Sequence, residues 1–414
     1  MEAAPDIAQP RWQRGLKRIA SLILHQWLLI GIGIVCALAY CFPNVAKHGG
    51  TIRSEYSIMY GVIAIIFLIS GLSIPRQKLI SHVLNWRLHV IVQVISFIFI
   101  PALVLAIVHI ILAADPGGKI DRAVLAGYIF TACIPTTIAS NVVMTRSAGG
   151  DDAAALVEVL LANILGPFVT AAWTIALMPK MAEFYPWRYG GGDLGSMYKE
   201  IFQQLGLSVL LPLFVGQLVK WTWPDRTALV LQKTKLPKLA TVCLLLLIWA
   251  TFSSCFATGA LQTLSAQSIV FVVLFNIILY TTLTTVCFFC SRPPQIFSSR
   301  RWSKPIFKRM SPEETIAVCF CGPAKSTALG IPLLYAMWQP VDLLLKAKTS
   351  VPVLLYTTEQ ICVAHFFVQL FRWWHARIVE KEELDDRTGD DVGMSIVEDP
   401  HRDHAGRGDE HTTV

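Results

Sequence analysis

The chain has 414 residues, of which 54% are hydrophobic and 15% are charged, with a formal net charge of +7 at pH 7 and a mean hydropathy of +0.54. This composition excludes an ordinary soluble globular domain, which carries a much larger share of charged residues. It requires lipid around most of the chain, and a bilayer core about 30 Å thick takes about 20 apolar residues per helix.

Apolar runs of this length predict an all-α polytopic membrane protein with ten transmembrane helices. All ten cysteines lie in these runs or at their edges, so no disulfide framework of a secreted domain is expected. No cleavage site follows the basic residues 1–21, so the first run is expected to remain as a signal anchor. The predicted spans are 22–42, 56–74, 88–113, 123–147, 152–178, 201–220, 237–257, 267–290, 314–337 and 350–374.

Basic residues are distributed unequally between the two sets of loops. The N-terminal segment and the even-numbered loops, counted with the bases Arg146, Lys220 and Lys238 at the adjoining span ends, hold 19 Lys and Arg, against 9 in the odd-numbered loops. The positive-inside rule therefore predicts that both termini are cytosolic, which an even number of spans allows. Because these bases flank membrane spans, no nucleic-acid partner is expected, and the lipid bilayer is the expected surrounding.

The predicted spans fall into two halves of five. Residues 22–178 form the first five-helix repeat, residues 201–375 form the second, and a polar linker, 179–200, joins them. Since five is odd, the halves have opposite orientations in the membrane, which is the inverted repeat of many secondary transporters. The charged residues 376–414 lack periodicity and are expected to form a disordered cytosolic tail.

The fourth and ninth predicted spans contain related interruptions. The fourth reads "CIPTTIASN" with Pro135, and 188 positions further on the ninth reads "CGPAKSTAL" with Gly322 and Pro323. Each proline removes a helical hydrogen bond, and the small polar residues beside it can satisfy the loosened backbone. Two broken helices at corresponding positions predict a binding site at the membrane midplane. The alternative is a pair of ordinary proline kinks.

Lys325 lies inside the second interruption, at a depth where a charge costs about 2.5–3.5 kcal/mol on insertion scales. It is predicted either to serve a binding site or to be a structural pin that keeps the crossing rigid. Glu158 and Glu359 are its candidate counter-charges, and Glu158 is expected either deep in its helix or directed back to the interface. Gln93 and Ser96 are further candidates for lining the site. The predicted substrate- or ion-binding residues are Thr136, Thr137, Ser140, Asn141, Glu158, Lys325, Ser326, Thr327 and Glu359.

Five longer motifs follow one another between about residues 26 and 375: "FLISGLSIPRQKL" (67–79), "CIPTTIASNVV" (133–143), "SAGGDDAAALVE" (147–158), "LPLFVGQLVK" (211–220) and "CGPAKSTALGIPLL" (321–334). In this order they resemble the bile acid:sodium symporter superfamily. The resemblance is strongest to its divergent branch, which contains solute carrier family 10 member 7 and the fungal regulators of calcium homeostasis. The charged tail is not part of the resemblance.

The resemblance implies that the broken fourth and ninth helices cross in a core domain, beside a panel domain of other helices. In sodium-coupled relatives a Ser-Asn pair in the fourth helix holds sodium, and here that pair is Ser140-Asn141. The ninth helix departs from the pattern. If Lys325 aligns with the relatives' Asn, then Phe320 and Ala324 stand where they carry Glu and Gln. Sodium coupling is therefore in doubt, and Lys325 is expected to occupy the electrostatic place of the lost sodium.

The sequence shows no phosphate-binding glycine loop, no HExxH motif and no paired intramembrane aspartates, so no enzyme, cofactor or metal site is expected. Two functions remain. In the first, which the resemblance implies, the protein restrains calcium uptake, directly, through a calcium-channel partner or secondarily to solute movement. In the second, it is a sodium- or proton-coupled carrier of a small anionic solute. The resemblance implies the plasma membrane, with the endoplasmic reticulum or Golgi as the alternative.

Overall fold

The computed structural model describes residues 27–47, 49–137, 140–189, 206–234, 236–259, 264–293, 309–338 and 340–397, with single positions at 199, 202–203 and 262. Within these ranges every regular element is a helix, and none is a strand. The predicted basic N-terminus (1–21), positions 190–198 of the predicted linker and the basic loop at 294–308 lie outside the described residues.

The helices, in chain order, are α2 (Trp27–Cys41), α3 (Pro43–Ala46), α4 (Ser54–Tyr56), α5 (Ile63–Ser73), α6 (Arg76–Val83), α7 (Trp86–Val94), α8 (Ile100–Ala114), α9 (Arg122–Cys133), α10 (Ser140–Ser147), α11 (Asp152–Leu177), α12 (Tyr185–Tyr189), α14 (Leu211–Thr222), α15 (Pro224–Thr234), α16 (Leu236–Ala257), α18 (Ala266–Ser291), α20 (Pro312–Cys321), α21 (Thr327–Met337) and α22 (Leu343–Val397). Three π-helical turns precede α5, α8 and α14, and one 3-10 turn precedes α12. They are η1 (Ser57–Val62), η2 (Ile95–Phe99), η4 (Gly206–Leu210) and η3 (Ala182–Phe184).

Five helical stretches of the described chain are long and apolar enough to cross a membrane, and one pair bent by 60° adds a sixth if it counts as a single span. This makes the protein an all-helical polytopic membrane protein, with fewer uninterrupted spans than the ten that the sequence predicts. Part of the difference comes from spans that are divided into shorter helices. The five stretches are Ser54–Ser73, Trp86–Ala114, Asp152–Leu177, Ala266–Ser291 and Leu344–Ile378, the bent pair is Pro224–Thr234 with Lys238–Ser254, and the shorter apolar helices are Ile30–Cys41, Arg122–Cys133 and Gly206–Thr222.

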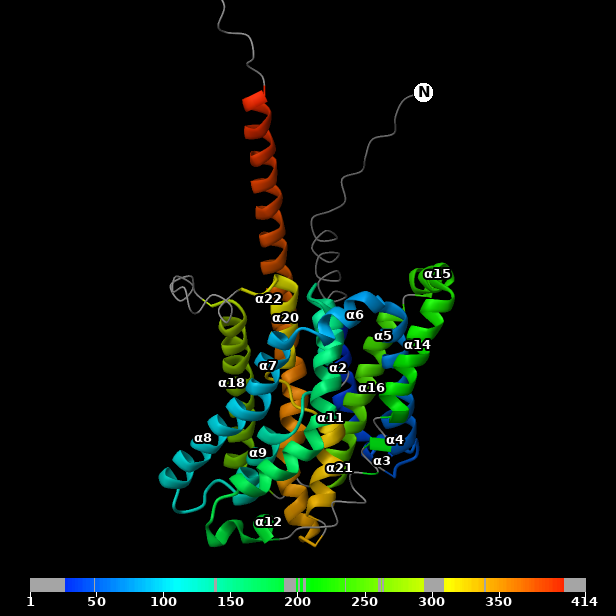
Figure 1. Cartoon of the computed structure of the whole chain (residues 1–414). Coiled ribbons are helices and arrows are strands. Elements are labelled where there is room, and N and C mark those ends of the chain that lie inside the picture. Colours follow the sequence, from blue (N-terminus) through cyan, green and yellow to red (C-terminus); the bar gives the residue numbers. More distant parts are fainter. Residues whose placement is uncertain are drawn as a thin grey trace, which may run out of the picture.

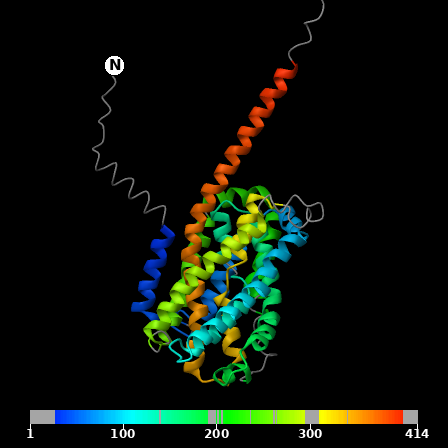
Figure 2. The same ribbon diagram turned by 90° about the vertical axis from the view of Figure 1, so that its left-hand side faces the viewer.

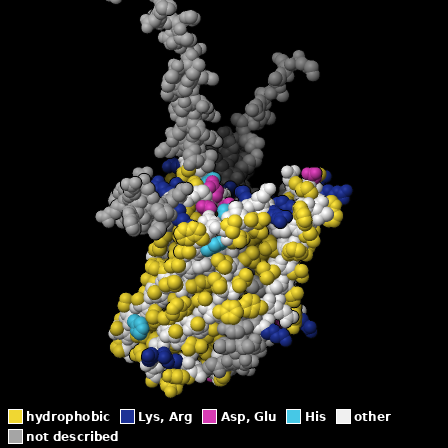
Figure 3. All heavy atoms as spheres, viewed as in Figure 1, with side chains coloured by type: hydrophobic (Ala, Val, Ile, Leu, Met, Phe, Trp, Pro, Cys, Tyr) yellow, Lys and Arg dark blue, Asp and Glu magenta, His cyan; other side chains and the backbone are white. Residues whose placement is uncertain are grey.

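The helices run side by side in a bundle whose two ends differ (Figures 1 and 2). The helices α6 and α15 lie at the same end as the C-terminal part of α22, and α12 lies at the other end with the beginning of α22. Hydrophobic side chains cover the face between the ends, while charged side chains gather toward its edges (Figure 3). An apolar belt between two polar ends is the surface that a bilayer requires.

The helix α22 continues far beyond the predicted tenth span, 350–374. It ends at Val397, and its last part leaves the bundle as a single rod (Figure 2). Residues 376–397, which the sequence predicts to be disordered, are therefore helical, and residues 398–414 lie outside the described chain. The segment 376–397 contains no proline, and a helix that is already nucleated gains one hydrogen bond for each residue added.

Both interruptions that the sequence predicts divide a helix. The helix α9 ends at Cys133, and Ile134 is extended (φ −69°, ψ 154°), as expected for a residue before a proline. In the same way α20 ends at Cys321 and α21 begins at Thr327. Helix ends therefore lie inside the bundle, where their unpaired N–H and C=O groups need partners.

Two glycines bring the backbones of α5 and α14 into contact. A Cβ atom on Gly71 would lie 2.5 Å from the carbonyl oxygen of Leu213, and one on Gly216 would lie 2.7 Å from that of Leu68. Gln217 strengthens the contact by donating from Nε2 to the Gly71 carbonyl at 2.8 Å. Small residues allow this close approach in membranes, where helices associate through packing.

We expect Gly71→Ala to destabilise the protein by about 1–3 kcal/mol, because the added methyl group meets backbone that cannot move aside. The measurement is the unfolding temperature of the purified protein in detergent. Gly61→Ala is the matched control, since a Cβ atom there meets nothing within 4 Å. Equal unfolding temperatures for the two variants would show that α5 and α14 are not in close contact.

Candidate functional site

The two helix interruptions contact each other inside the bundle. The backbone N–H of Ser326 donates to the Pro135 carbonyl at 2.9 Å, and Thr136 Oγ1 donates to the Cys321 carbonyl at 2.8 Å. All four residues are buried. Each interruption thus supplies a partner that the other broken helix lacks.

Lys325 lies at this crossing with only 1% of its surface exposed. Its Nζ donates to the Ser96 carbonyl at 2.8 Å, to Ser96 Oγ at 3.1 Å and to the Ile134 carbonyl at 3.0 Å. It also lies 5.9 Å from the centre of the Phe97 ring, within range of a cation–π interaction. An ammonium has three donors, and here all three are used.

The Ser96 carbonyl is free to accept because of the π-helical turn η2. The Ile100 N–H, which would bond Ser96 in an α-helix, donates instead to the Ile95 carbonyl. The next N–H in the π pattern would come from Pro101, which has none. The Ile134 carbonyl is likewise free, because it lies at the C-terminal end of α9. The ammonium therefore satisfies two carbonyls that the local sequence leaves unpaired.

The helix α22 fixes the backbone of the second interruption. Gln360 accepts a hydrogen bond from the Lys325 N–H at 2.9 Å and donates from Nε2 to the Lys325 carbonyl at 2.8 Å. Tyr356, one turn earlier, donates its hydroxyl to the Pro323 carbonyl at 2.8 Å. These buried contacts hold the lysine backbone from both sides, so any movement of α22 is transmitted to the crossing.

Glu158 is fully buried, at 0% exposure, but it does not pair with Lys325. Its Oε1 lies 2.6 Å from His89 Nδ1, and its Oε2 accepts from Gln93 Nε2 at 2.9 Å. His89 Nε2 lies 2.9 Å from the Val83 carbonyl and must carry a hydrogen to donate to it. His89 and Gln93 are therefore the partners of Glu158, and its carboxyl group needs no cation from Lys325.

Glu359 is also no counter-charge of Lys325 and lies elsewhere, among polar groups of α9 and α18. It faces Asn276 and Tyr128, while its neighbour Gln360 is the residue directed to the crossing. In the described part of the chain no carboxylate lies within ion-pair distance of Lys325. The predicted counter-charges are therefore wrong, because carbonyl oxygens replace them.

The polar side chains of the first interruption bond mainly to one another. Asn141 Nδ2 donates to Thr136 Oγ1 at 2.6 Å, and Ser140 Oγ donates to Thr137 Oγ1 at 3.1 Å. None of the four accepts a hydrogen bond from the lysine ammonium. Their oxygens are held together at the beginning of α10, next to the crossing.

Two hydroxyl groups at the second interruption have no protein partner. Ser326 Oγ and Thr327 Oγ1 are buried and form no hydrogen bond within the described chain. A buried hydroxyl without a partner costs about 1–3 kcal/mol, so such a group is a natural contact for a bound molecule. Both side chains therefore have hydrogen-bonding capacity left over at the crossing.

Sequence reasoning missed several polar side chains that support the crossing. Neither His89, which contacts Glu158, nor Gln360, which bonds the Lys325 backbone, is among the predicted residues. Asn163 was also missed, although it donates to the Thr136 carbonyl at 3.1 Å. The available signal was the same in each case, a polar residue inside a predicted span.

A second group of charges joins four helices at the end of the bundle where α6 lies. His82 Nε2 is 3.0 Å from Asp151 Oδ2, and the Asp151 N–H donates to the Glu313 carbonyl at 3.1 Å. His375 Nε2 lies 2.7 Å from Glu313 Oε1. No set of three His, Cys, Asp or Glu side chains in the described ranges is placed to hold a metal ion. The cluster therefore connects α6, α11, α20 and α22 through ion pairs.

His82 and Asp151 stabilise each other's charged forms. The hydrogen bond to Asp151 raises the pKa of His82, more than burial lowers it. Burial alone would raise the pKa of Asp151, but the hydrogen bond and positive charge of His82 outweigh it and leave this pKa lowered. Both groups are therefore charged over a wider pH range than they are in water.

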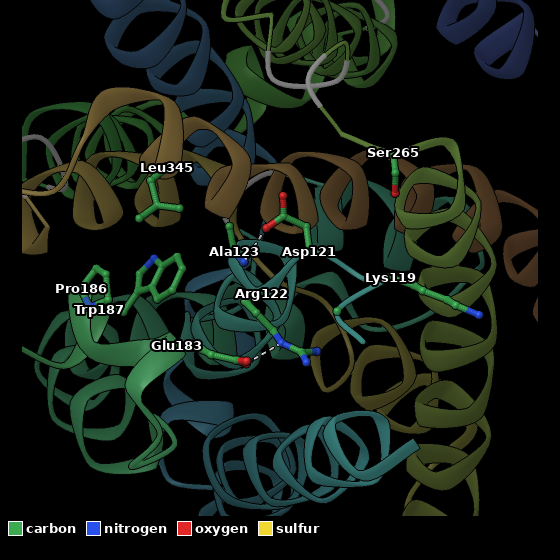
Figure 4. Close-up of a pocket in the computed structure, with 10 residues that line it drawn as sticks. Lys119, Asp121, Arg122, Ala123, Glu183, Pro186, Trp187, Ser265 and Leu345 are labelled. Carbon is green, nitrogen blue, oxygen red and sulfur yellow. Dashed lines mark hydrogen bonds and ion pairs between the residues drawn. The ribbon is translucent and has the colours of Figure 1, made fainter. Parts of the chain in front are cut away.

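At the opposite end of the bundle lies a cavity of about 510 Å³ (Figure 4). It opens at the beginning of α9, and Arg122 and Glu183 face each other across it at 2.6 Å. Asp121, also on its wall, pairs with Lys348 at 2.8 Å. None of the predicted binding residues lines this cavity, so it is separate from the crossing.

A helical bundle with an apolar belt and two broken helices that complete each other inside it defines a membrane carrier of the secondary-transporter class. The chain belongs to the SBF-like CPA transporter family, whose profile matches residues 26–373. It is 39% identical to Solute carrier RCH1 of Candida albicans over 90% of this chain and 95% of that protein. It is 38% identical to Solute carrier RCH1 of Saccharomyces cerevisiae over 86% of each chain. Sodium/bile acid cotransporter 7 of Mus musculus is 26% identical over 86% of this chain and 95% of its own length.

We expect the stability that His82 contributes to be lost as pH rises. A histidine with a raised pKa stabilises the folded state fully below its unfolded value, about 6.5, and loses that effect as pH passes through the folded value. The measurement is the unfolding temperature in detergent between about pH 5 and about pH 9, compared between wild type and His82→Gln. The difference between the two proteins should be largest at the acidic end and shrink at the alkaline end.

His109→Gln is the control for this experiment, because His109 is exposed on α8. Its profile should follow that of the wild type. A wild-type minus His82→Gln difference that stays constant with pH would mean that His82 and Asp151 do not form a charged pair.

Proposed function

We propose that this chain is a solute-carrier-like membrane protein that negatively regulates cytosolic calcium by restraining calcium uptake when external calcium is high. The proposal follows from the resemblance to the branch that contains the fungal regulators of calcium homeostasis. Relatives named Solute carrier RCH1, at 39% and 38% identity, support a carrier of the same kind. The observation on which the proposal depends is the buried ammonium of Lys325 at the crossing.

The scaffold we propose for this function is a ten-helix inverted repeat of five plus five spans. In predicted span order, α2 packing on α16 joins the first span to the seventh, and α5 packing on α14 joins the second to the sixth. In a five-plus-five repeat the first span corresponds to the sixth and the second to the seventh. Exchanging the two halves therefore converts the first–seventh pair into the sixth–second pair. This reciprocal packing, like the two related interruptions, is what a pseudo-twofold axis in the membrane plane produces.

We place both termini in the cytosol and the protein in the plasma membrane, with the endoplasmic reticulum or Golgi as the alternative. The basic helices α6 and α15 lie at the same end as the C-terminal part of α22 (Figure 1). This supports a cytosolic position for that end, because cytosolic loops carry an excess of Lys and Arg. The cavity at the beginning of α9 then faces away from the cytosol.

Lys325 supports a regulator without sodium coupling at the crossing. Its ammonium bonds the Ser96 and Ile134 carbonyls, oxygens of the kind that a sodium ion would need. The ammonium is part of the chain, so it neither enters nor leaves as an ion does. The crossing thus has a tethered ammonium group in place of an exchangeable ion. The protein restrains calcium uptake directly, through a calcium-channel partner, or secondarily to moving another solute.

The second candidate is a sodium- or proton-coupled carrier of a small anionic organic solute. It is favoured by the free hydroxyls of Ser326 and Thr327 beside a positive charge that no carboxylate neutralises. An anion at the crossing would find one charge and two hydrogen-bond donors there.

Cytosolic calcium after a pulse of high external calcium tests the first proposal. Cells that lack the protein are compared with cells that carry wild type or Lys325→Ala at equal surface level. We expect a larger calcium transient in the null cells, corrected by wild type and left largely uncorrected by Lys325→Ala. The reason is that the variant leaves two buried carbonyls unpaired and removes the ammonium charge from the crossing.

Ser96→Ala is the matched control, because it removes one of the three acceptors and keeps both carbonyls. It should correct the transient nearly as well as wild type. Full correction by Lys325→Ala would assign the lysine a structural or solute-related role instead. A normal transient in the null cells would exclude the calcium function altogether.

A direct transport assay tests whether sodium acts at the crossing. Purified protein in liposomes should show no sodium-dependent uptake of a bile salt or steroid sulfate, because Phe320 and Ala324 stand where sodium-coupled relatives have Glu and Gln. Sodium-stimulated uptake of either compound, absent from empty liposomes, would mean that Lys325 does not replace the ion.

A further inference from the structure

Glu359 belongs to a second polar group inside the membrane part of the protein. It lies on α22 and faces Asn276 of α18 and Tyr128 of α9. The Tyr128 hydroxyl donates to Asn276 Oδ1 at 2.8 Å and approaches the Val272 carbonyl at 3.1 Å. Asn276 and Tyr128 are almost completely buried, each at 1% exposure.

Two atoms of this group have no hydrogen-bond partner. Glu359 Oε2 and Asn276 Nδ2 are both buried and unpaired, although the two side chains face each other. Tyr128 determines this arrangement, because its hydroxyl occupies Asn276 Oδ1 and leaves the NH2 group directed toward the carboxyl group. The carboxyl group therefore has an amide donor near it but no well-formed bond to it.

Glu359 lies deep in the apolar stretch Leu344–Ile378, about 22 Å from its start and about 28 Å from its end along the helix axis. No Lys, Arg or His side chain of the described chain forms an ion pair with it. A carboxylate at this depth without a cation is strongly unfavourable, whereas the protonated acid is not.

We propose that Glu359, positioned by Asn276 and Tyr128, is an intramembrane proton-binding site of this carrier. A bound proton makes α22 neutral at mid-membrane and gives the carboxyl group an O–H donor. Loss of the proton leaves a carboxylate that the Asn276 amide can approach. This inference goes beyond the calcium function proposed above and does not depend on it.

The ligand is a proton and not a metal cation, because the group has too few free oxygens. A hard cation takes about six oxygen ligands, and here Asn276 Oδ1 and the Val272 carbonyl already accept from Tyr128. The amide presents its NH2 side to the carboxyl group, and an NH2 group repels a cation.

The other titratable groups around Glu359 are few. Tyr128 faces it from α9, Cys362 lies almost one turn further along α22, and α18 contributes the neutral Asn276. None of them is a base that would hold the carboxylate charged at neutral pH. The titration of this site is therefore that of a single carboxyl group.

Labelling with a hydrophobic carbodiimide tests the proposal, since this reagent adds to protonated carboxyl groups in apolar surroundings. The full-length purified protein is labelled in detergent between about pH 5 and about pH 9, and the modified peptide is mapped by mass spectrometry. We expect modification at Glu359 that falls at least about tenfold across this range, as expected for a single titrating carboxyl group. Glu359→Gln should abolish it.

Glu158 is an internal control in the same molecule, because it is fully buried and bonded to His89 and Gln93. It should remain unmodified. Tyr128→Phe removes the hydroxyl that orients the Asn276 amide, so the pH midpoint of labelling should move upward while unfolding remains cooperative.

Three results would overturn the proposal: no modification at Glu359, modification that is independent of pH, or equal modification of Glu158. The wild-type peptide map alone decides between these results if Glu359→Gln fails to fold. None of the outcomes uses a calcium signal, so failure here is distinct from failure of the calcium proposal.

Discussion

The structure depends on one constraint, that a backbone interrupted inside a membrane must still have all its polar groups paired. The prolines after Ile134 and Gly322 end two helices in the interior, and Pro101 removes a donor from a third. The interruptions then complete each other through Ser326 and Thr136, and the Lys325 ammonium takes the remaining carbonyls. The lysine therefore has two roles: it donates hydrogen bonds in place of missing backbone N–H groups, and it carries a charge.

Lys325, Glu158 and Glu359, three of the ionisable groups inside the bundle, are stabilised in three different ways. Lys325 is held by neutral oxygens, and Glu158 is bonded to His89 and Gln93. Glu359 has only an amide and a tyrosine hydroxyl near it. Two of the three are linked through α22, where Gln360 bonds the lysine backbone and the adjacent Glu359 points to α18. A change of charge on Glu359, on one side of α22, is thus one residue away from Gln360, whose bonds hold the crossing on the other side of the helix.

The sequence predicted the features that depend on a single residue type. It did not predict features that depend on which residue of another helix is the hydrogen-bond partner. Proline and its neighbours located both interruptions, and an isolated lysine marked the crossing. The acidic counter-charges expected for Lys325 were wrong. One of its actual acceptors, the Ser96 carbonyl, is freed by a π-helical turn, which the identity of the side chains does not reveal. Glu158 was assigned to the lysine and not to His89, because the distance between two helices is not encoded in either helix alone. The helical continuation of α22 was missed because charged residues suggest solvent and say little about whether an existing helix ends.

A fixed ammonium changes what the crossing of a carrier can do. An exchangeable ion transfers the free energy of its gradient by binding on one side of a membrane and leaving on the other. Lys325 is tethered by its own chain and by Gln360, so it can contribute to a transport cycle only by gaining and losing a proton or by moving with its helix. A protein in which the crossing is held closed by such a residue keeps the architecture of a carrier without the ion that drives one. Such a protein has two routes. It can bind its driving ion at another group, and Glu359 has the depth and the free oxygen atom for this. Alternatively, it can act through its conformation on another protein. These two routes are compatible, because α22 contacts both sites.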